Sequence, residues 1–233
     1  MNPKFKLYID NSKSVDNPSM MMDFTTNSDM LELISSIDNF YNKVMNPLLY
    51  SYWEIFFQYF YHMFNLYQYD TYELQANIES FPHPFNYSSI GKENIYSIFN
   101  IEYLKLHLTK YNNLVINKFN ISEVNFDKTI TNNYGKHNPN PPIIVESKFQ
   151  QPYSMVDGNH RFIDRFMLTQ SVNTKYIQYS NLNAKMFINK FNLAIYLFAN
   201  ESYELAKITQ DNPEKLYDSM VKSIEFCKAK LEC

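Results

Sequence analysis

The segment "IIVESKFQQPYSMVDGNHRFIDRF", residues 143–166, decides the fold. It contains two short apolar runs, at 143–147 and 153–156, and the polar connector 148–152 separates them, which predicts a pair of strands. A glycine and charged residues follow at once, and from residue 160 onward the apolar residues take a helical spacing. We therefore predict two strands, then a loop that leads directly into a helix.

The same segment gathers the rarest residues of the chain. It contains both arginines, Arg161 and Arg165, and one of the three glycines, Gly158, whereas the other positive charges among the 21 Lys and Arg residues are lysines. Arginine offers a planar fork of donors that binds a phosphate or carboxylate in two places, and lysine offers a point charge. This concentration of arginine favours an anion site.

A strand followed by a glycine loop and a helix is suited to binding anions. The first N–H groups of a helix lack partners and lie at the positive end of its dipole, so a phosphate can bind there. Gly158 permits a close approach, Arg161 can reach the same anion, and His160 can donate a hydrogen bond or transfer a proton. The alternative interpretation is purely structural, with Asp157 capping the helix and His160 pairing with Asp164.

Composition limits the class of protein. The chain has 233 residues, of which 45% are hydrophobic and 17% aromatic, so it is long and apolar enough for a sizeable core. Its formal net charge of -3 lacks the basic footprint of most nucleic-acid-binding proteins. Cys227 and Cys233 are its two cysteines, with no C-x-x-C spacing, and the N-terminus lacks the apolar run of a signal peptide. We expect a cytoplasmic protein.

Residues 47–67 test whether the chain crosses a membrane. The segment is long enough for a span, but its apolar content is mostly Tyr and Phe. Glu54, Gln58 and His62 interrupt it at every fourth position and form one polar stripe on a helix. We predict an amphipathic core helix that Pro47 begins. A proton-relay or metal face along the stripe is the alternative interpretation.

The rest of the chain is predicted to contain both helices and strands. Asn27 or Ser28 is expected to cap a first helix, whose buried stripe is Met30, Leu33, Ile34, Ile37 and Tyr41. The other expectations are a strand at 4–10, a break at 80–91, a helix at 92–111, an extended stretch at 112–126, a strand at 175–182, a buried helix or strand at 191–199, and a helix opened by Pro213 that carries Leu216, Met220, Ile224, Cys227 and Leu231.

The stretch "NPNPPIIVESKFQQPYSMVDGNHRFIDRF", residues 138–166, resembles the core of the ParB/sulfiredoxin-like superfamily. In that group an N-P-rich lead, a P-I-x-V strand and a hairpin precede a G-x-H-R loop that opens a helix. The resemblance spans roughly 111–183 and implies an α+β fold with a small mixed sheet, to which this chain adds N-terminal aromatic-rich helices. We expect an N-terminal strand and helical region at 1–110, a nucleotide-binding core at 111–200 and a C-terminal helix at 201–233, packed as one unit.

Three branches of this superfamily make different predictions. Sulfiredoxins carry a reactive cysteine immediately before the His-Arg pair, but Asn159 stands there in this chain, so that thiol chemistry is excluded. Chromosome-partitioning ParB proteins continue into a helix-turn-helix domain, and no basic recognition helix is visible after residue 182. The loop D-G-H-H-R of the free serine kinases, which transfer a phosphoryl group from ADP to a small hydroxyl substrate, is similar to residues 157–161 in four of five positions.

The resemblance implies a nucleotide-binding protein, either a phosphotransferase or a phosphohydrolase. The implied phosphate-binding residues are Asp157, Gly158, Asn159, His160, Arg161 and Arg165, and the catalytic candidates are Asp157, His160 and Glu146. Glu146 is a candidate base because it ends the first strand of the hairpin; the alternative is a solvent-facing charge. ATP, ADP and CTP are equally compatible ligands, with Mg²⁺ as a candidate metal and an unidentified acceptor. The rival functions are a nucleotide-gated module with a protein or DNA partner, and a toxin or effector.

Overall fold

The computed structural model describes residues 25–68, 80–85, 95–110, 115–116, 123–125, 140–158, 161–163 and 174–232. Its helices are α1 (Asn27–Val44), α2 (Pro47–Leu66), α3 (Ile101–Lys110), α5 (Lys190–Asp211) and α6 (Leu216–Leu231), with 3₁₀ turns η4 (Tyr179–Asn181), η5 (Ala184–Met186) and η6 (Pro213–Lys215). Its strands are β1 (Ser80–Phe85), β2 (Ile95–Asn100), β3 (Val115–Ile116), β4 (Val124–Asn125), β5 (Ile143–Glu146), β6 (Tyr153–Asp157) and β7 (Thr174–Ile177). The α+β prediction is confirmed. The strand expected at 4–10 lies outside the described residues.

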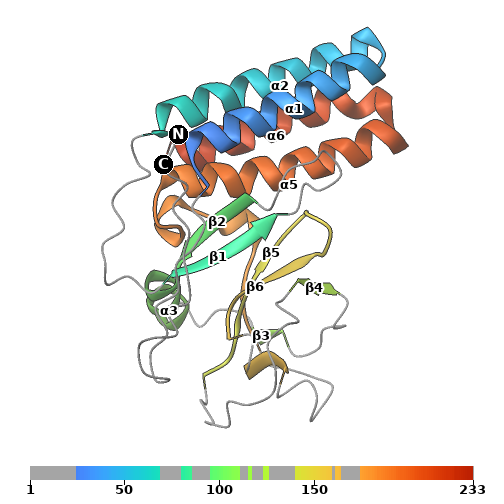
Figure 1. Ribbon diagram of the computed structural model, residues 1–233. Helices are drawn as coiled ribbons and strands as arrows, with labels where there is room; N and C mark the ends of the chain where they lie inside the picture. Colours follow the sequence, from blue (N-terminus) through green and yellow to red (C-terminus); the bar gives the residue numbers. More distant parts are fainter. Residues whose placement is uncertain are drawn as a thin grey trace.

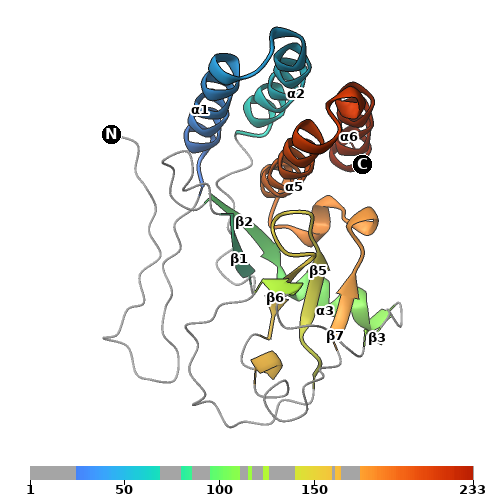
Figure 2. The ribbon, with the colours of Figure 1, turned by 90° about the vertical axis from the view of Figure 1, so that its right-hand side faces the viewer.

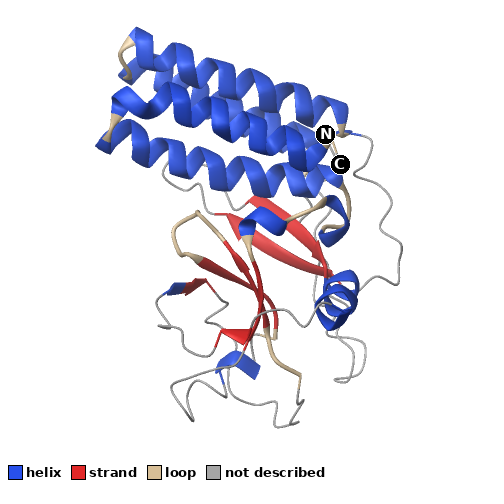
Figure 3. Cartoon of the chain, turned by 180° about the vertical axis from the view of Figure 1, so that it is seen from behind, coloured by secondary structure: helices blue, strands red, loops and turns tan. Residues whose placement is uncertain are grey.

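Four helices, α1, α2, α5 and α6, lie side by side in a bundle on one side of the strands (Figure 1, Figure 3). The apolar face of α2 fills the bundle with Trp53, Phe56, Phe57, Phe60, Met63 and Phe64. Glu54, Gln58 and His62 are exposed, which confirms the predicted polar stripe. No helix in the described part of the chain is long and apolar enough to cross a membrane.

The first two helices begin with side-chain caps. Thr26 caps α1, one residue earlier than expected: its backbone N–H donates to Asp29 Oδ2 at 2.8 Å, and the Asp29 N–H donates to Thr26 Oγ1 at 3.2 Å. Pro47 is the first residue of α2, as predicted, and Asn46 Oδ1 accepts a hydrogen bond from the Leu48 N–H at 2.9 Å. Each cap satisfies a backbone donor that the helix itself cannot.

An antiparallel hairpin of β1 and β2 replaces part of a predicted helix. The prediction of a helix at 92–111 was wrong for residues 95–100, which form β2. The break expected at 80–91 contains β1, and β1 pairs with β2 from Ser80↔Asn100 to Phe85↔Ile95. Tertiary contacts override the local helical spacing. The Ile98 N–H donates to Asn192 Oδ1 at 2.8 Å, so β2 is bonded to α5.

A five-stranded mixed sheet with the order β3-β7-β5-β6-β4 contains the two strands predicted within residues 143–157 (Figure 1, Figure 2). The predicted strand pair is confirmed as β5 and β6, which are antiparallel, and β7 pairs in parallel with β5. Val145 and Val156 belong to the core that the sheet shares with the bundle, whereas Ile144, Met155 and Phe162 belong to a smaller core on the other face. The two faces are therefore both buried around β5 and β6.

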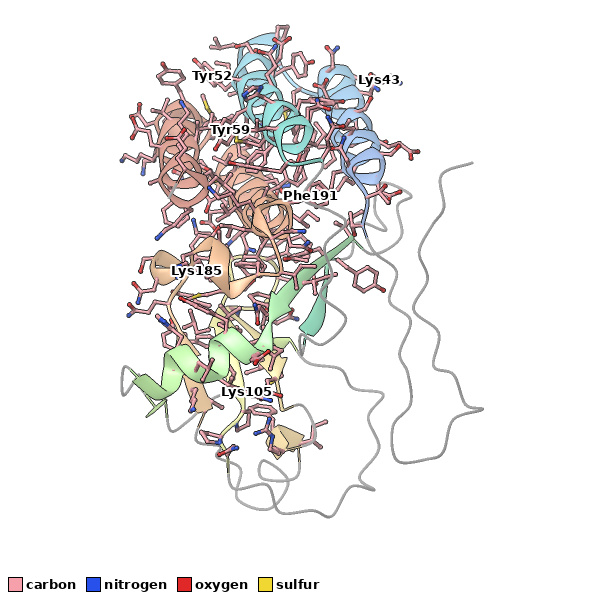
Figure 4. All side chains as sticks on the ribbon, turned by 90° about the vertical axis from the view of Figure 1, so that its left-hand side faces the viewer. Lys43, Tyr52, Tyr59, Lys105, Lys185 and Phe191 are labelled. Carbon is pink, nitrogen blue, oxygen red and sulfur yellow. The ribbon has the colours of Figure 1, made fainter. Side chains whose placement is uncertain are left out.

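Helix α5 connects the bundle to the sheet. It resolves the ambiguity at 191–199 in favour of a helix, and every residue from 191 to 202 is buried. Phe191, labelled in Figure 4, packs on Phe64 of α2, and their ring centroids are 5.6 Å apart. The boundary expected between residues 200 and 201 falls inside α5, because its buried face continues to Leu205. All five apolar residues predicted to line α6 are buried.

Candidate functional site

The turn after β6 lies at the end of the sheet that points away from the helix bundle (Figure 1, Figure 2). The strand ends at Asp157, and Gly158 has a φ of 88°, a conformation that L side chains rarely adopt. The Gly158 carbonyl accepts a hydrogen bond from the Phe162 N–H at 2.8 Å, and residues 161–163 are helical. A helical turn therefore follows the glycine, as predicted, and the remainder of the helix expected from residue 160 onward lies outside the described residues.

Arg161 is held in place at this turn by two hydrogen bonds. Its Nη2 donates to Asp157 Oδ2 at 2.6 Å, and its Nη1 donates to the carbonyl of Asn140 at 3.0 Å. The side chains of Asp157 and Arg161 are each 16% exposed. A Cβ placed on Gly158 would lie 2.8 Å from Arg161 Nη2 and 2.9 Å from its Nε, so the guanidinium occupies the space that the missing side chain leaves. The glycine is therefore needed both for its φ and for the position of Arg161.

This arrangement joins a fixed cation to a carboxylate at the start of a helix. A guanidinium carries five N–H donors, and the bonds to Asp157 and Asn140 leave donors that can bind an anion. Asp157 competes with any anion for Arg161 Nη2. An anion that replaced it would release the carboxylate beside the bound ligand.

The remaining loop residues of the sequence prediction lie outside the described part of the chain. Asn159, His160 and Arg165 are in this group, so their proposed roles remain predictions. Asp157, Gly158 and Arg161 are brought together as expected.

Glu146 does not lie with them. The register pairs Glu146 with Tyr153 and Ile143 with Asp157, so three residues of strand, about 10 Å, separate Glu146 from the turn. Its Oε2 accepts a hydrogen bond from the Tyr179 N–H at 2.8 Å. Burial, followed by the charge of Glu146, raises the pKa of Tyr176 above its ordinary value. Glu146 fixes the start of η4 and is not placed to act on a ligand at Asp157.

The bundle end of the same hairpin carries a polar network that the sequence analysis missed. Asn200 Oδ1 accepts hydrogen bonds from Ser147 Oγ at 2.8 Å, the Lys148 N–H at 2.6 Å and the Phe149 N–H at 3.2 Å. Asn200 Nδ2 donates to the Tyr196 carbonyl at 2.8 Å. One buried amide of α5 therefore holds the connector between β5 and β6.

Glu201, the next residue of α5, holds the connector through charge. Its Oε1 accepts from Lys148 Nζ at 2.6 Å and from the Tyr179 hydroxyl at 2.8 Å. Burial, then the charge of Glu201, raises the pKa of Tyr179 and that of the Cys227 thiol well above their ordinary values. The available sequence signal was the polar pair Asn200-Glu201 directly after the apolar run 191–199.

The metal-ligating side chains in the part of the chain that the structure describes are the candidates for a metal centre. Within the described ranges, no three His, Cys, Asp or Glu side chains are placed to hold a metal ion. A Mg²⁺ ion commonly needs only one or two carboxylates when substrate phosphates supply other ligands, and Asp157 offers one.

No protein-family model, curated protein or solved structure matches the chain. The candidate site therefore rests on the geometry of the turn and on its sequence.

Proposed function

We propose that the chain binds a nucleotide, with the phosphate groups held at the turn of residues 157–161. The observation that carries this proposal is the position of Arg161, which two hydrogen bonds hold over Gly158 at the start of a helix. Fixing the guanidinium in advance lowers the entropy lost on binding. The resemblance of the loop to the ParB/sulfiredoxin-like superfamily supports the same ligand class, and Asn159 and His160 are the further donors it implies.

The proposed activity is phosphoryl transfer to an acceptor hydroxyl or to water. The arriving phosphate replaces Asp157 on Arg161 Nη2, and the released carboxylate accepts the proton of the attacking hydroxyl. A new P–O bond forms to the acceptor oxygen, while the P–O bond to the leaving group breaks and its electrons stay on the leaving oxygen. Arg161 stabilises the charge on the transferred group, and Mg²⁺, if bound through phosphate oxygens and Asp157, supplies further neutralisation. Asp157 takes the role of base because Glu146 is held at the other end of the hairpin.

Calorimetric titration with ATP, ADP and CTP in the presence of Mg²⁺ tests the binding site. Arg161→Lys is expected to weaken binding by ~10–100-fold, because a point charge replaces a two-point contact with phosphate. Arg165→Lys is the matched control, since it is the same substitution one turn further along the sequence, and its effect is expected to stay within about threefold. Equal affinities for wild type and both variants would contradict the phosphate site.

A turnover assay distinguishes the proposed enzyme from the alternative, a non-enzymatic module that a nucleotide controls. Labelled ATP and ADP are incubated with wild type and with Asp157→Asn, with and without a library of small hydroxyl compounds. The enzyme predicts phosphate release or transfer that Asp157→Asn lowers by ~10²–10⁴-fold, the usual contribution of a general base, while nucleotide binding persists. Nucleotide binding without turnover would instead favour a module in which the nucleotide controls a protein or DNA partner.

A further inference from the structure

The cation of the candidate site already has a carboxylate bonded to it. Arg161 Nη2 donates to Asp157 Oδ2 at 2.6 Å, and Arg161 Nη1 donates to the Asn140 carbonyl at 3.0 Å. The guanidinium also fills the space over Gly158, and the side chains of Asp157 and Arg161 are both largely buried. A ligand therefore meets a donor and an acceptor that are held together, and it cannot move Arg161 away without breaking both hydrogen bonds.

An anion bound to Arg161 lies against the carboxylate of Asp157. Nη2 carries two N–H groups, and one of them holds Asp157 Oδ2. Two acceptors on the two N–H groups of one planar nitrogen lie about 4.5 Å apart. A second oxygen of a tetrahedral anion on the other N–H therefore reaches the carboxylate. An anion that takes the place of Oδ2 on Nη2 lies closer to it still.

Contact between the carboxylate and a fully ionised anion is unfavourable. Both groups are negative and both only accept hydrogen bonds, and their repulsion is stronger in a largely buried position than in water. A proton on the anion removes this conflict, because the resulting O–H group donates to Asp157 while another oxygen accepts from Arg161. An O–H group bonded to a carboxylate makes one of the stronger hydrogen bonds in proteins. The pair therefore matches an anion that carries a proton.

We propose that Asp157 and Arg161 together recognise a protonated phosphate group, with Arg161 donating to one phosphate oxygen and Asp157 accepting from a P–OH group. This inference rests on the proposed function, because it specifies the form of phosphate that the same turn binds. When water is the acceptor in the proposed reaction, its proton passes to Asp157 beside the new phosphate group, so the product complex contains the same hydrogen bond.

The proposal assigns a selectivity to the site. Inorganic phosphate carries at least one proton at neutral pH, and the terminal phosphate of a nucleotide takes one up with a second pKa of about 6. Sulfate and phosphodiesters carry no proton at neutral pH. The site therefore selects free phosphate and terminal phosphate groups over sulfate and over the backbone of a nucleic acid.

Calorimetric titration with inorganic phosphate, sulfate and dimethyl phosphate tests this selectivity, at pH 7 and constant ionic strength with EDTA to exclude divalent metal ions. Wild type is expected to bind phosphate ~10-fold or more tightly than either other anion. In Asp157→Asn the amide can donate to sulfate, so the preference for phosphate over sulfate should fall below ~3-fold. Asp218→Asn, the same substitution on an exposed position of α6, is the matched control and should keep the wild-type preference.

Three results would overturn the role of Asp157. They are equal binding of phosphate and sulfate by wild type, an unchanged preference in Asp157→Asn, and no binding of inorganic phosphate by wild type. The comparison of anions on wild type does not depend on the folding of any variant. ADP titrated with Mg²⁺ distinguishes the two proposals: ADP binding together with one of these results leaves the nucleotide site intact, whereas a wild type that binds neither ADP nor phosphate contradicts both.

Discussion

At its bundle end the β5–β6 hairpin is bonded to α5 through Asn200 and Glu201, whereas at its other end Asp157, the last residue of β6, bonds to Arg161 in the turn that follows. Both ends place polar groups in largely buried positions. At the bundle end, Asn200 Oδ1 accepts three hydrogen bonds and Glu201 has two partners, all within the chain. At the other end, the Arg161 guanidinium has five N–H donors, and its bonds to Asp157 and Asn140 are made through Nη2 and Nη1. The first arrangement stabilises the fold, and the second is suited to a ligand.

The same comparison explains why Glu146 failed as a member of the site. The sequence pattern of an apolar strand followed by a carboxylate is the same at either end of a hairpin. Its position along β5 decides its role, since the register places Glu146 beside Tyr153 and the bundle and not beside Asp157. Substitutions at the two ends should therefore separate stability from binding.

The largest effect is expected for Asn200→Ala. The change leaves the Ser147 hydroxyl and the Lys148 N–H without this acceptor, while the Phe149 N–H keeps its bond to Ser147 Oγ at 3.1 Å, so we expect a loss of ~2–4 kcal/mol in the free energy of unfolding. Urea denaturation measures it. Asn39→Ala, on an exposed position of α1, is the matched control and should change stability by no more than ~0.5 kcal/mol. Equal losses for both variants would mean that the connector does not depend on α5.

Gly158→Ala is expected to have the next largest effect, at the opposite end. The substitution forces an alanine into a φ of 88° and moves the Arg161 guanidinium, so we expect a loss of ~1–3 kcal/mol together with weaker nucleotide binding. Urea denaturation and calorimetric titration measure the two effects. In an Arg161→Ala background the clash is absent, so the same substitution should cost less. An undiminished cost there would assign the whole effect to the backbone.

A smaller effect concerns alkaline pH. Burial raises the pKa of the Cys227 thiol, whereas in the unfolded chain the thiol ionises near ~8.5. The unfolded state then holds fewer protons than the native state, so stability is full below pH ~8.5 and falls above it, by at most ~1.4 kcal/mol per pH unit. Denaturation between pH 8 and 10 measures this slope, with Cys233→Ser as the background. Adding Cys227→Ala should reduce the slope of the free energy of unfolding against pH. An unchanged slope would mean that other groups cause the pH dependence.

The sequence predicted what depends on neighbouring residues. Apolar runs bounded by polar connectors predicted β5 and β6, and Gly158 together with the rare Arg161 predicted the turn. The strand β2 was predicted as helix because its apolar spacing fits both structures, and its pairing with β1 and its bond to Asn192 decide between them. Long-range contacts of this kind leave no local pattern.

The same limit applies to the buried polar groups. Asn200 bonds to a connector about fifty residues earlier in the sequence, and no sequence pattern within α5 predicts this partner. Thr174, the first residue of β7, precedes the strand expected at 175–182. Its hydroxyl is buried with no hydrogen-bond partner among the described residues, which is a property of packing, so only the structure reveals it.

The helix bundle also has a consequence for biosynthesis. Trp53 of α2 donates a hydrogen bond to Thr209 of α5 at 3.1 Å, across a sequence separation of 156 residues. At translation rates of ~5–20 residues per second, α2 leaves the ribosome roughly 8–30 s before this partner exists. Throughout that interval the aromatic face of α2 has no α5 or α6 to cover it. The nascent chain should therefore be a substrate for ribosome-associated chaperones until its last helices are made.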